Sequence, residues 1–161
     1  MWERLIAILV LAVLLAACGG DDAVVEVSGQ TDCVEADSTA SGPALADDVP
    51  FTSVDITYEC DYTMSDERVS GSGPAVITVD MSLDGDTRVG QISGTINISN
   101  DGGTWAGTVS GTTTWTPTTQ HVHVLDGVYA GTGDYEGLRF LVHNEGTLFP
   151  WTTTGRIESA E

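Results

Sequence analysis

Three histidines, His121, His123 and His143, are the side chains whose type and spacing best fit metal or acid–base chemistry. His121 and His123 are two residues apart on a predicted strand, so both side chains point to the same face. Imidazoles at this spacing can chelate Zn²⁺ or Cu²⁺ if a neighbouring strand supplies a third ligand, for which His143 and Glu145 are the candidates. These histidines are therefore the candidate ligand-binding or metal-binding residues.

The face that the histidines occupy decides what they can do. Val122 and Val124 alternate with them, and we expect the two valines to face the core, which leaves the histidines outside in solvent. If the register turns them inward instead, the same histidines become candidates for proton transfer or for polarising a ligand. No serine lies in a nucleophile-elbow motif and no pair of carboxylates stands out, so the catalytic residues stay unknown and we expect no cofactor.

A second candidate metal site lies in residues 80–86, DMSLDGD, which match the first half of a calcium-binding loop. Oxygen-bearing side chains alternate and a glycine occupies the sixth position. The candidate ligands are Asp80, Ser82, Asp84 and Asp86. The twelfth position is Gln91, where such a loop needs a bidentate glutamate, and the flanking residues are typical of strands. We interpret the segment as a polar hairpin turn, with weak calcium binding as the alternative.

The three cysteines divide by position. Cys33 and Cys60 form an even pair, and in an oxidising compartment such a pair predicts a disulfide. The loop that this bond closes would stabilise the fold by about 3 kcal/mol on the chain-entropy model. Cys18 stands apart, directly after an apolar segment, and indicates a different chemistry.

Cys18 completes a pattern that resembles the lipobox of bacterial lipoproteins. Arg4 precedes the unbroken apolar run of residues 5–17, which ends in Leu, Ala, Ala before Cys18. The run is shorter than the about 20 residues that span a bilayer as a helix. The resemblance implies cleavage before Cys18, fatty acylation with groups such as palmitate, and a lipid anchor on the outer face of the bacterial cell membrane. The alternative is an ordinary secreted protein whose signal happens to end near a cysteine.

Charge excludes one large class of partners. The net charge is −19, the chain has no lysine, and only four arginines follow the signal: Arg68, Arg88, Arg139 and Arg156. Nucleic-acid binding needs clustered cations that replace phosphate counterions, so we expect no nucleic-acid partner. Electrostatic docking on anionic lipid is excluded for the same reason, and membrane attachment must come from the lipid anchor.

The elements that would position these residues are strands. Residues 1–17 form the signal, and residues 18–50, rich in Gly, Ser, Asp and Ala, are expected to be an acidic flexible tether, with a short edge strand at residues 23–27 as an option. From residue 51 apolar and polar side chains alternate, and glycine-rich turns recur. The expected strands are residues 54–63, 75–83, 88–99, 104–115, 121–125, 137–144 and 151–157. We therefore predict an all-β domain over residues 51–161, an antiparallel up-and-down barrel of about eight strands after an N-terminal signal helix and linker.

Two segments carry a resemblance to known barrels. Residues 129–138, YAGTGDYEGL, and the preceding strand at 105–111, WAGTVSG, are similar to motifs of the allene oxide cyclase-like and dirigent-like families. The resemblance covers about residues 90–158. It implies an eight-stranded antiparallel barrel with a central apolar cavity. None of the functional residues of those families can be placed on positions of this sequence.

The aromatic side chains fit a barrel of this kind. We expect core or barrel-end positions for Trp105, Trp115, Phe140, Phe149 and Trp151, with a stacking platform for a sugar or apolar ligand as the alternative. The favoured function is a membrane-tethered binding module for a small apolar ligand or an envelope partner. The alternatives are a cyclase or isomerase that uses the barrel cavity, and a structural spacer or adhesion domain. The oligomeric state is left open.

Overall fold

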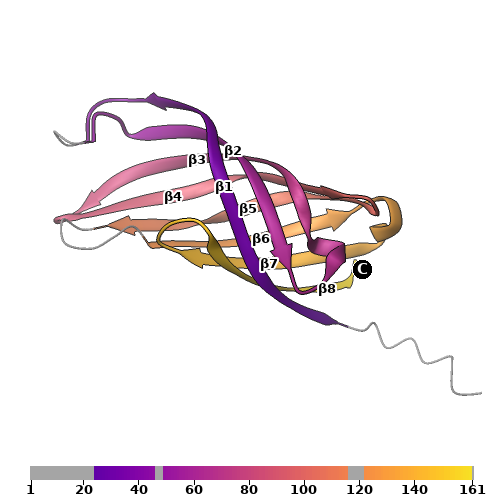
Figure 1. Cartoon of the computed structure of the whole chain (residues 1–161). Coiled ribbons are helices and arrows are strands. Elements are labelled where there is room, and N and C mark those ends of the chain that lie inside the picture. Colours follow the sequence, from indigo (N-terminus) through magenta and orange to yellow (C-terminus); the bar gives the residue numbers. More distant parts are fainter. Residues whose placement is uncertain (1–23, 46–48, 116–121, 161) are drawn as a thin grey trace, which may run out of the picture.

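The protein is an eight-stranded antiparallel barrel in a computed structural model that describes residues 24–45, 49–115 and 122–160. Each strand pairs with the next along the chain, and β8 closes the ring on β1 (Figure 1). The strands are β1 (Val25–Ser41), β2 (Ser53–Met64), β3 (Gly71–Asp84), β4 (Thr87–Asn100), β5 (Gly103–Trp115), β6 (Val122–Gly131), β7 (Leu138–Gly146) and β8 (Trp151–Ser159). The predicted all-β up-and-down barrel is confirmed.

Alternation along each strand builds the interior. In β2, Cys60 and Tyr62 are buried while Asp61 between them is exposed, as the period of two requires. Glycines bring strands together on the inner face: a Cβ at Gly107 of β5 would overlap the backbone oxygen of Val128 on β6. Because glycine has no side chain, these positions permit the tight coiling of a small barrel.

The position of β1 differs from the prediction for residues 18–50. The flexible tether predicted for residues 18–50 was wrong for Val25–Ser41, because these residues form β1 and complete the barrel. β1 pairs with β8 from Val25 to Thr31 and with β2 from Gly29 to Ser41. Its inward positions include Gly29, Thr31 and Cys33, so the strand lacks the large apolar side chains that mark the others. The signal segment and Cys18 lie outside the described residues.

One end of the barrel is closed by a plug built on η1 (Glu67–Val69) and η2 (Gly133–Tyr135). Trp105 is fully buried there, stacks on Tyr135 at 5.1 Å, and donates its indole N–H to the Arg68 carbonyl at 2.7 Å. Asn100 accepts a hydrogen bond from the Tyr135 hydroxyl at 2.6 Å and donates to the carbonyl oxygens of the η1 segment. The buried Trp105 ring therefore seals the interior at this end, while the outer surface of the plug carries polar and charged residues such as Glu67, Arg68 and Asp134.

The two short 3-10 turns are the helices of the described residues. Asp66 caps η1 by accepting from the Arg68 backbone N–H, and the Arg68 guanidinium also donates to its carboxylate at 2.7 Å. That side-chain hydrogen bond holds the pKa of Asp66 below its usual range. No helix in the described part of the chain is both long enough and apolar enough to cross a bilayer.

Candidate ligand-binding site

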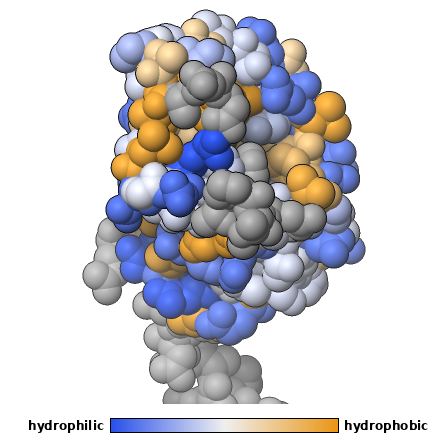
Figure 2. Space-filling view, turned by 90° about the vertical axis from the view of Figure 1, so that its left-hand side faces the viewer, coloured by the Kyte–Doolittle hydropathy of each residue, from blue (hydrophilic) through white to orange (hydrophobic). Residues whose placement is uncertain are grey.

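The opposite end of the barrel holds an apolar pocket of about 500 Å³. Figure 2 looks onto this end, where hydrophobic residues gather at two sides of the face. Aliphatic side chains from three neighbouring strands form much of the wall: Val54, Ile56, Ile77, Val79, Met81 and Ile92. They point inward because they occupy alternate positions of β2, β3 and β4. Among the described residues no carboxylate, lysine or arginine lines the pocket.

A row of rings forms the other side of the pocket. Phe149, from the loop between β7 and β8, contacts Tyr58 edge to face at 5.6 Å and stacks on Trp151 at 4.4 Å. Trp151 in turn stacks on His123 of β6 at 4.9 Å. Because these rings pack against one another, they form a rigid part of the pocket wall. Trp115 lies at the same pocket, while Leu148, which is 72 % exposed, lies at its rim.

The expected core and platform roles of the aromatics are divided between the two ends. Trp105 and Phe140 are fully buried core residues, in edge-to-face contact at 6.0 Å. Trp115, Phe149 and Trp151 line the pocket instead. The barrel thus has aromatic plugging at its sealed end and aromatic lining at the end that carries the pocket.

The structure separates the histidines. The expectation that Val122 and Val124 face the core was wrong for this strand, because Val122 is 38 % exposed whereas His123 turns into the pocket. His143 lies on the outer face of β7, where its Nδ1 is 2.8 Å from the Asp126 carboxylate. His121 lies outside the described residues. His123 and His143 are therefore on opposite faces of the wall and do not form the candidate shared metal site.

No described residues form a metal centre. Groups of three or more His, Cys, Asp or Glu side chains that could hold an ion do not occur in residues 24–45, 49–115 and 122–160. In the hairpin of β3 and β4, Asp80 accepts a hydrogen bond from Ser53 at 2.8 Å and Ser82 donates to the Val89 carbonyl. Asp84 and Asp86 lie exposed around the turn at Gly85, whose φ is +61°. The candidate calcium residues thus lie along a two-stranded hairpin, and two of them, Asp80 and Ser82, are hydrogen-bonded to other protein groups.

The predicted disulfide is present. Cys33 of β1 and Cys60 of β2 are bonded, with their Cα atoms 4.1 Å apart, and they are direct partners in the strand register. Both lie on the inner face, beside a small void of about 30 Å³ beneath the pocket. The bond therefore fixes the wall of the barrel just below the candidate site.

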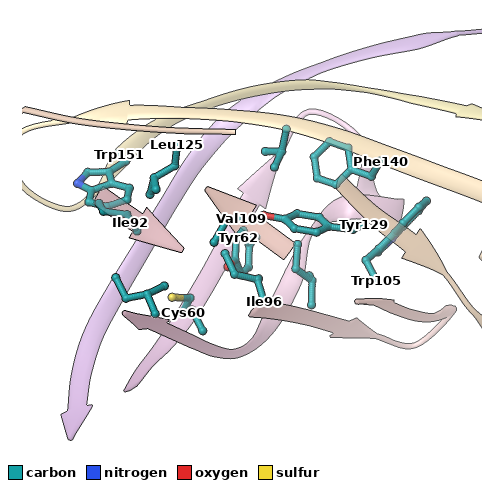
Figure 3. Close-up of a cluster of buried hydrophobic side chains, with 14 of the residues drawn as sticks. Cys60, Tyr62, Ile92, Ile96, Trp105, Val109, Leu125, Tyr129, Phe140 and Trp151 are labelled. Carbon is teal, nitrogen blue, oxygen red and sulfur yellow. The ribbon is translucent and has the colours of Figure 1, made fainter. Parts of the chain in front are cut away.

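The apolar interior below the pocket contains a few polar but uncharged groups. The Thr153 hydroxyl donates to Asn144 Oδ1 at 2.7 Å, and the Thr31 hydroxyl lies 2.7 Å from that of Thr153. Tyr62 and Tyr129 bury their hydroxyl groups without a hydrogen-bond partner among the described residues. In Figure 3 the Tyr129 oxygen is turned toward Val109 and toward Tyr62, which lie in the middle of the cluster. Burial raises the pKa of both phenols above the usual range, so both are neutral at physiological pH.

Two more buried polar atoms lie in the pocket itself. The Trp151 indole nitrogen and the Thr113 hydroxyl are buried and make no hydrogen bond within the described part of the chain. Sequence reasoning identified Trp151 only as an aromatic residue and did not single out Thr113. The alternation of β5 places Thr113 on the inner face, but only the packed barrel reveals that its hydroxyl lacks a partner.

Comparison with protein-family models, with curated proteins and with solved structures finds no significant match to this chain. The likeness of residues 90–158 to cyclase-like and dirigent-like barrels therefore remains a resemblance. The function rests on the geometry and chemistry of the pocket.

Proposed function

We propose that the protein is a lipid-anchored, extracytoplasmic binding module that holds a small apolar ligand in its barrel. The observation that carries the proposal is the apolar pocket of about 500 Å³ at one end. Ligand sites typically measure about 300–1,000 Å³ and combine mostly apolar walls with a few polar groups. The aliphatic wall, the row of rings and the two buried polar atoms match that description.

A pocket-blocking variant tests the proposal. Val54→Trp places an indole at the half-buried wall of the pocket, whereas Val76→Trp places the same ring on the outer face of β3. Blocking about 55 Å² of apolar contact removes about 1.4 kcal/mol of binding free energy, which is about tenfold in affinity. We expect Val54→Trp to weaken binding of the uncharged probe N-phenyl-1-naphthylamine by about that factor or more, measured by its fluorescence. Val76→Trp should bind like wild type.

Two results would contradict the proposal. One is the failure of wild type to bind any of a panel of uncharged lipophilic probes. The other is equal probe affinity in Val54→Trp and Val76→Trp, because that would place the bound probe outside the pocket. Circular dichroism of both variants provides the folding control.

A cyclase or isomerase is the second candidate, and it is favoured by one observation: His123 lines the pocket. An enzyme of this kind relies mainly on shape, since a fitted cavity supplies much of the proximity effect. Mass spectrometry of molecules extracted from the purified protein distinguishes the two functions. A binding module is expected to hold a single species, and an enzyme two isomers whose ratio changes in His123→Gln. A spacer domain would not need the pocket.

The proposed anchor gives a prediction at Cys18. Cys18→Ser removes the sulfur that would carry the lipid, so the variant should lose all fatty-acid label and its processing at the membrane should change, while the barrel folds as before. Each buried methylene contributes about 0.8 kcal/mol to membrane binding, and two or three acyl chains suffice for a stable anchor. Metabolic labelling with a radioactive fatty acid and membrane fractionation measure both effects.

The remaining cysteines supply the control for this labelling. Cys33→Ala/Cys60→Ala removes the two disulfide-bonded cysteines but keeps Cys18, so it should label as wild type does. Equal label in wild type and Cys18→Ser would show that the anchor lies elsewhere, and the proposed location on the outer face of the membrane would lose its support.

A further inference from the structure

The indole N–H of Trp151 is a buried donor inside an apolar pocket. Trp151 begins β8 and is 8 % exposed, and its nitrogen has no hydrogen-bond partner within the described residues. An indole N–H can only donate, and buried donors are almost always satisfied in folded proteins. In Figure 3 this nitrogen points away from the other labelled core side chains. A group on a ligand that accepts a hydrogen bond would satisfy it.

The ring that carries this donor is held in place from several sides. It stacks on Phe149, at 4.4 Å, and on His123, at 4.9 Å. Gly146 of β7 lies against the edge of the same indole, and a Cβ at Gly146 would overlap the Trp151 Cδ1 atom. The glycine therefore provides the space that the indole occupies. A donor fixed in this way is preorganised, which lowers the entropy cost of binding an acceptor.

Thr113 adds a second polar atom at the same level of the barrel. It pairs with His123 in the β5–β6 register, and His123 pairs with Gly146 in the β6–β7 register. The register thus places Thr113, His123 and the Trp151 ring over Gly146 along one belt of the wall. The Thr113 side chain is 3 % exposed and its hydroxyl has no partner within the described residues. Thr113, His123 and the Trp151 indole therefore bring three polar groups of the pocket to one level of the barrel.

The electrostatics of the pocket favour an uncharged ligand. No described arginine or lysine lines the pocket to pair with an anion, and the whole chain carries a net charge of −19. Burying an ionised group without a partner is strongly unfavourable, and the negative field of the protein adds repulsion toward anions. No described carboxylate lines the pocket to hold a cation either.

We propose that the pocket takes an uncharged apolar molecule bearing one carbonyl-type oxygen, which accepts a hydrogen bond from the Trp151 indole N–H. The inference rests on the proposed binding function and names the class of its ligand. Thr113 is placed to donate a second hydrogen bond to the same polar group or to a neighbouring one. The apolar body of the ligand lies against the aliphatic wall of β2 and β3.

Three probes with one ring system test this ligand class on the full-length protein: 2-acetylnaphthalene, 2-ethylnaphthalene and 2-naphthoate. Their affinities are measured by displacement of N-phenyl-1-naphthylamine. We expect the ketone to bind about fivefold more tightly than the hydrocarbon, the factor that one neutral hydrogen bond contributes. The carboxylate should bind most weakly. Trp151→Phe keeps an aromatic ring but removes the donor, so it should bring the ratio of ketone to hydrocarbon affinity to about one.

A matched variant and a spectroscopic measurement complete the test. Trp105→Phe changes a tryptophan at the opposite end of the barrel, outside the pocket, and should leave the preference for the ketone intact. In wild type, the nuclear magnetic resonance signal of one indole N–H should move downfield with the ketone and not with the hydrocarbon. This second readout needs no folded variant at position 151.

The outcomes separate the two proposals. Equal binding of ketone and hydrocarbon by wild type, or a ketone preference that survives in Trp151→Phe, would overturn the proposed hydrogen bond while leaving an apolar binding module in place. Tightest binding of 2-naphthoate would overturn the uncharged class. Failure of all three probes to displace bound N-phenyl-1-naphthylamine would overturn the proposed ligand class, and failure of N-phenyl-1-naphthylamine and the three probes alike to bind would overturn the binding function itself.

Discussion

Trp105→Ala is expected to lower the free energy of unfolding by about 4 kcal/mol, because it opens the sealed end of the barrel. The Trp105 side chain is fully buried, stacks on Tyr135 at 5.1 Å and meets Phe140 edge to face at 6.0 Å. Its hydrogen bond to the Arg68 carbonyl is also lost, but Asn100 still donates to that oxygen at 3.0 Å. The cavity and the lost ring contacts therefore dominate the effect. Urea unfolding followed by circular dichroism measures it.

Trp115→Ala is the matched control, since Trp115 lies at the other end of the same strand. Its side chain is only partly buried and lines the pocket. We expect a loss of about 1.5 kcal/mol in stability, because less surface leaves the core. Equal destabilisation by the two substitutions would show that the plug does not hold the sealed end. A difference of about 2.5 kcal/mol would support the plug.

The strands from residue 51 onward could be predicted because apolar and polar side chains alternate along them. In β2 the inward positions are large and apolar, and the outward ones are acidic or threonine, so the period of two is unmistakable. β1 could not be predicted in the same way. Its inward residues Gly29 and Thr31 are small or polar. The Thr31 hydroxyl finds its hydrogen-bond partners in Thr153 and Asn144, which are distant in the sequence.

The two valines of β6, Val122 and Val124, predict the wrong face for His123 because they are not on the inner face of this strand. Leu125 and Tyr129 share the parity of His123 and are 4 % and 1 % exposed, so they set the inner face of this strand. Val122, Val124 and Val128 fall on the other face. A larger window would have favoured the correct phase, since a tyrosine and a leucine four residues apart mark the same face.

The candidate pocket itself depends on information that one strand does not carry. Its level is defined by the register that aligns Thr113, His123 and Gly146 across three strands. Its unpartnered donor becomes visible only when the packing around the Trp151 nitrogen is known. Sequence patterning predicts which side chains point inward, whereas the volume left between them depends on barrel closure.

Removal of the disulfide is the second large effect that we expect. Cys33→Ala/Cys60→Ala opens a bond between residues 27 positions apart, for which the loop-entropy model gives a loss of about 3.5 kcal/mol. Alanine is preferred to serine because Cys60 is 3 % exposed and a buried hydroxyl would add its own cost. Urea unfolding of the double variant, and of wild type with and without reductant, measures the loss. Reduced wild type should unfold at nearly the same urea concentration as the variant.

The position of the disulfide predicts where its loss is felt first. β8 pairs with β1 only as far as Thr31, so beyond that residue β1 is held by its ladder to β2 and by the bond at Cys33. Amide hydrogen exchange should therefore increase most in the last part of β1, from Asp37 to Ser41, while the amides of Val25 to Gly29 keep more of their protection. Uniformly faster exchange along β1 would contradict this local role. It would show that the bond stabilises the barrel only as a whole, through the entropy of the unfolded chain.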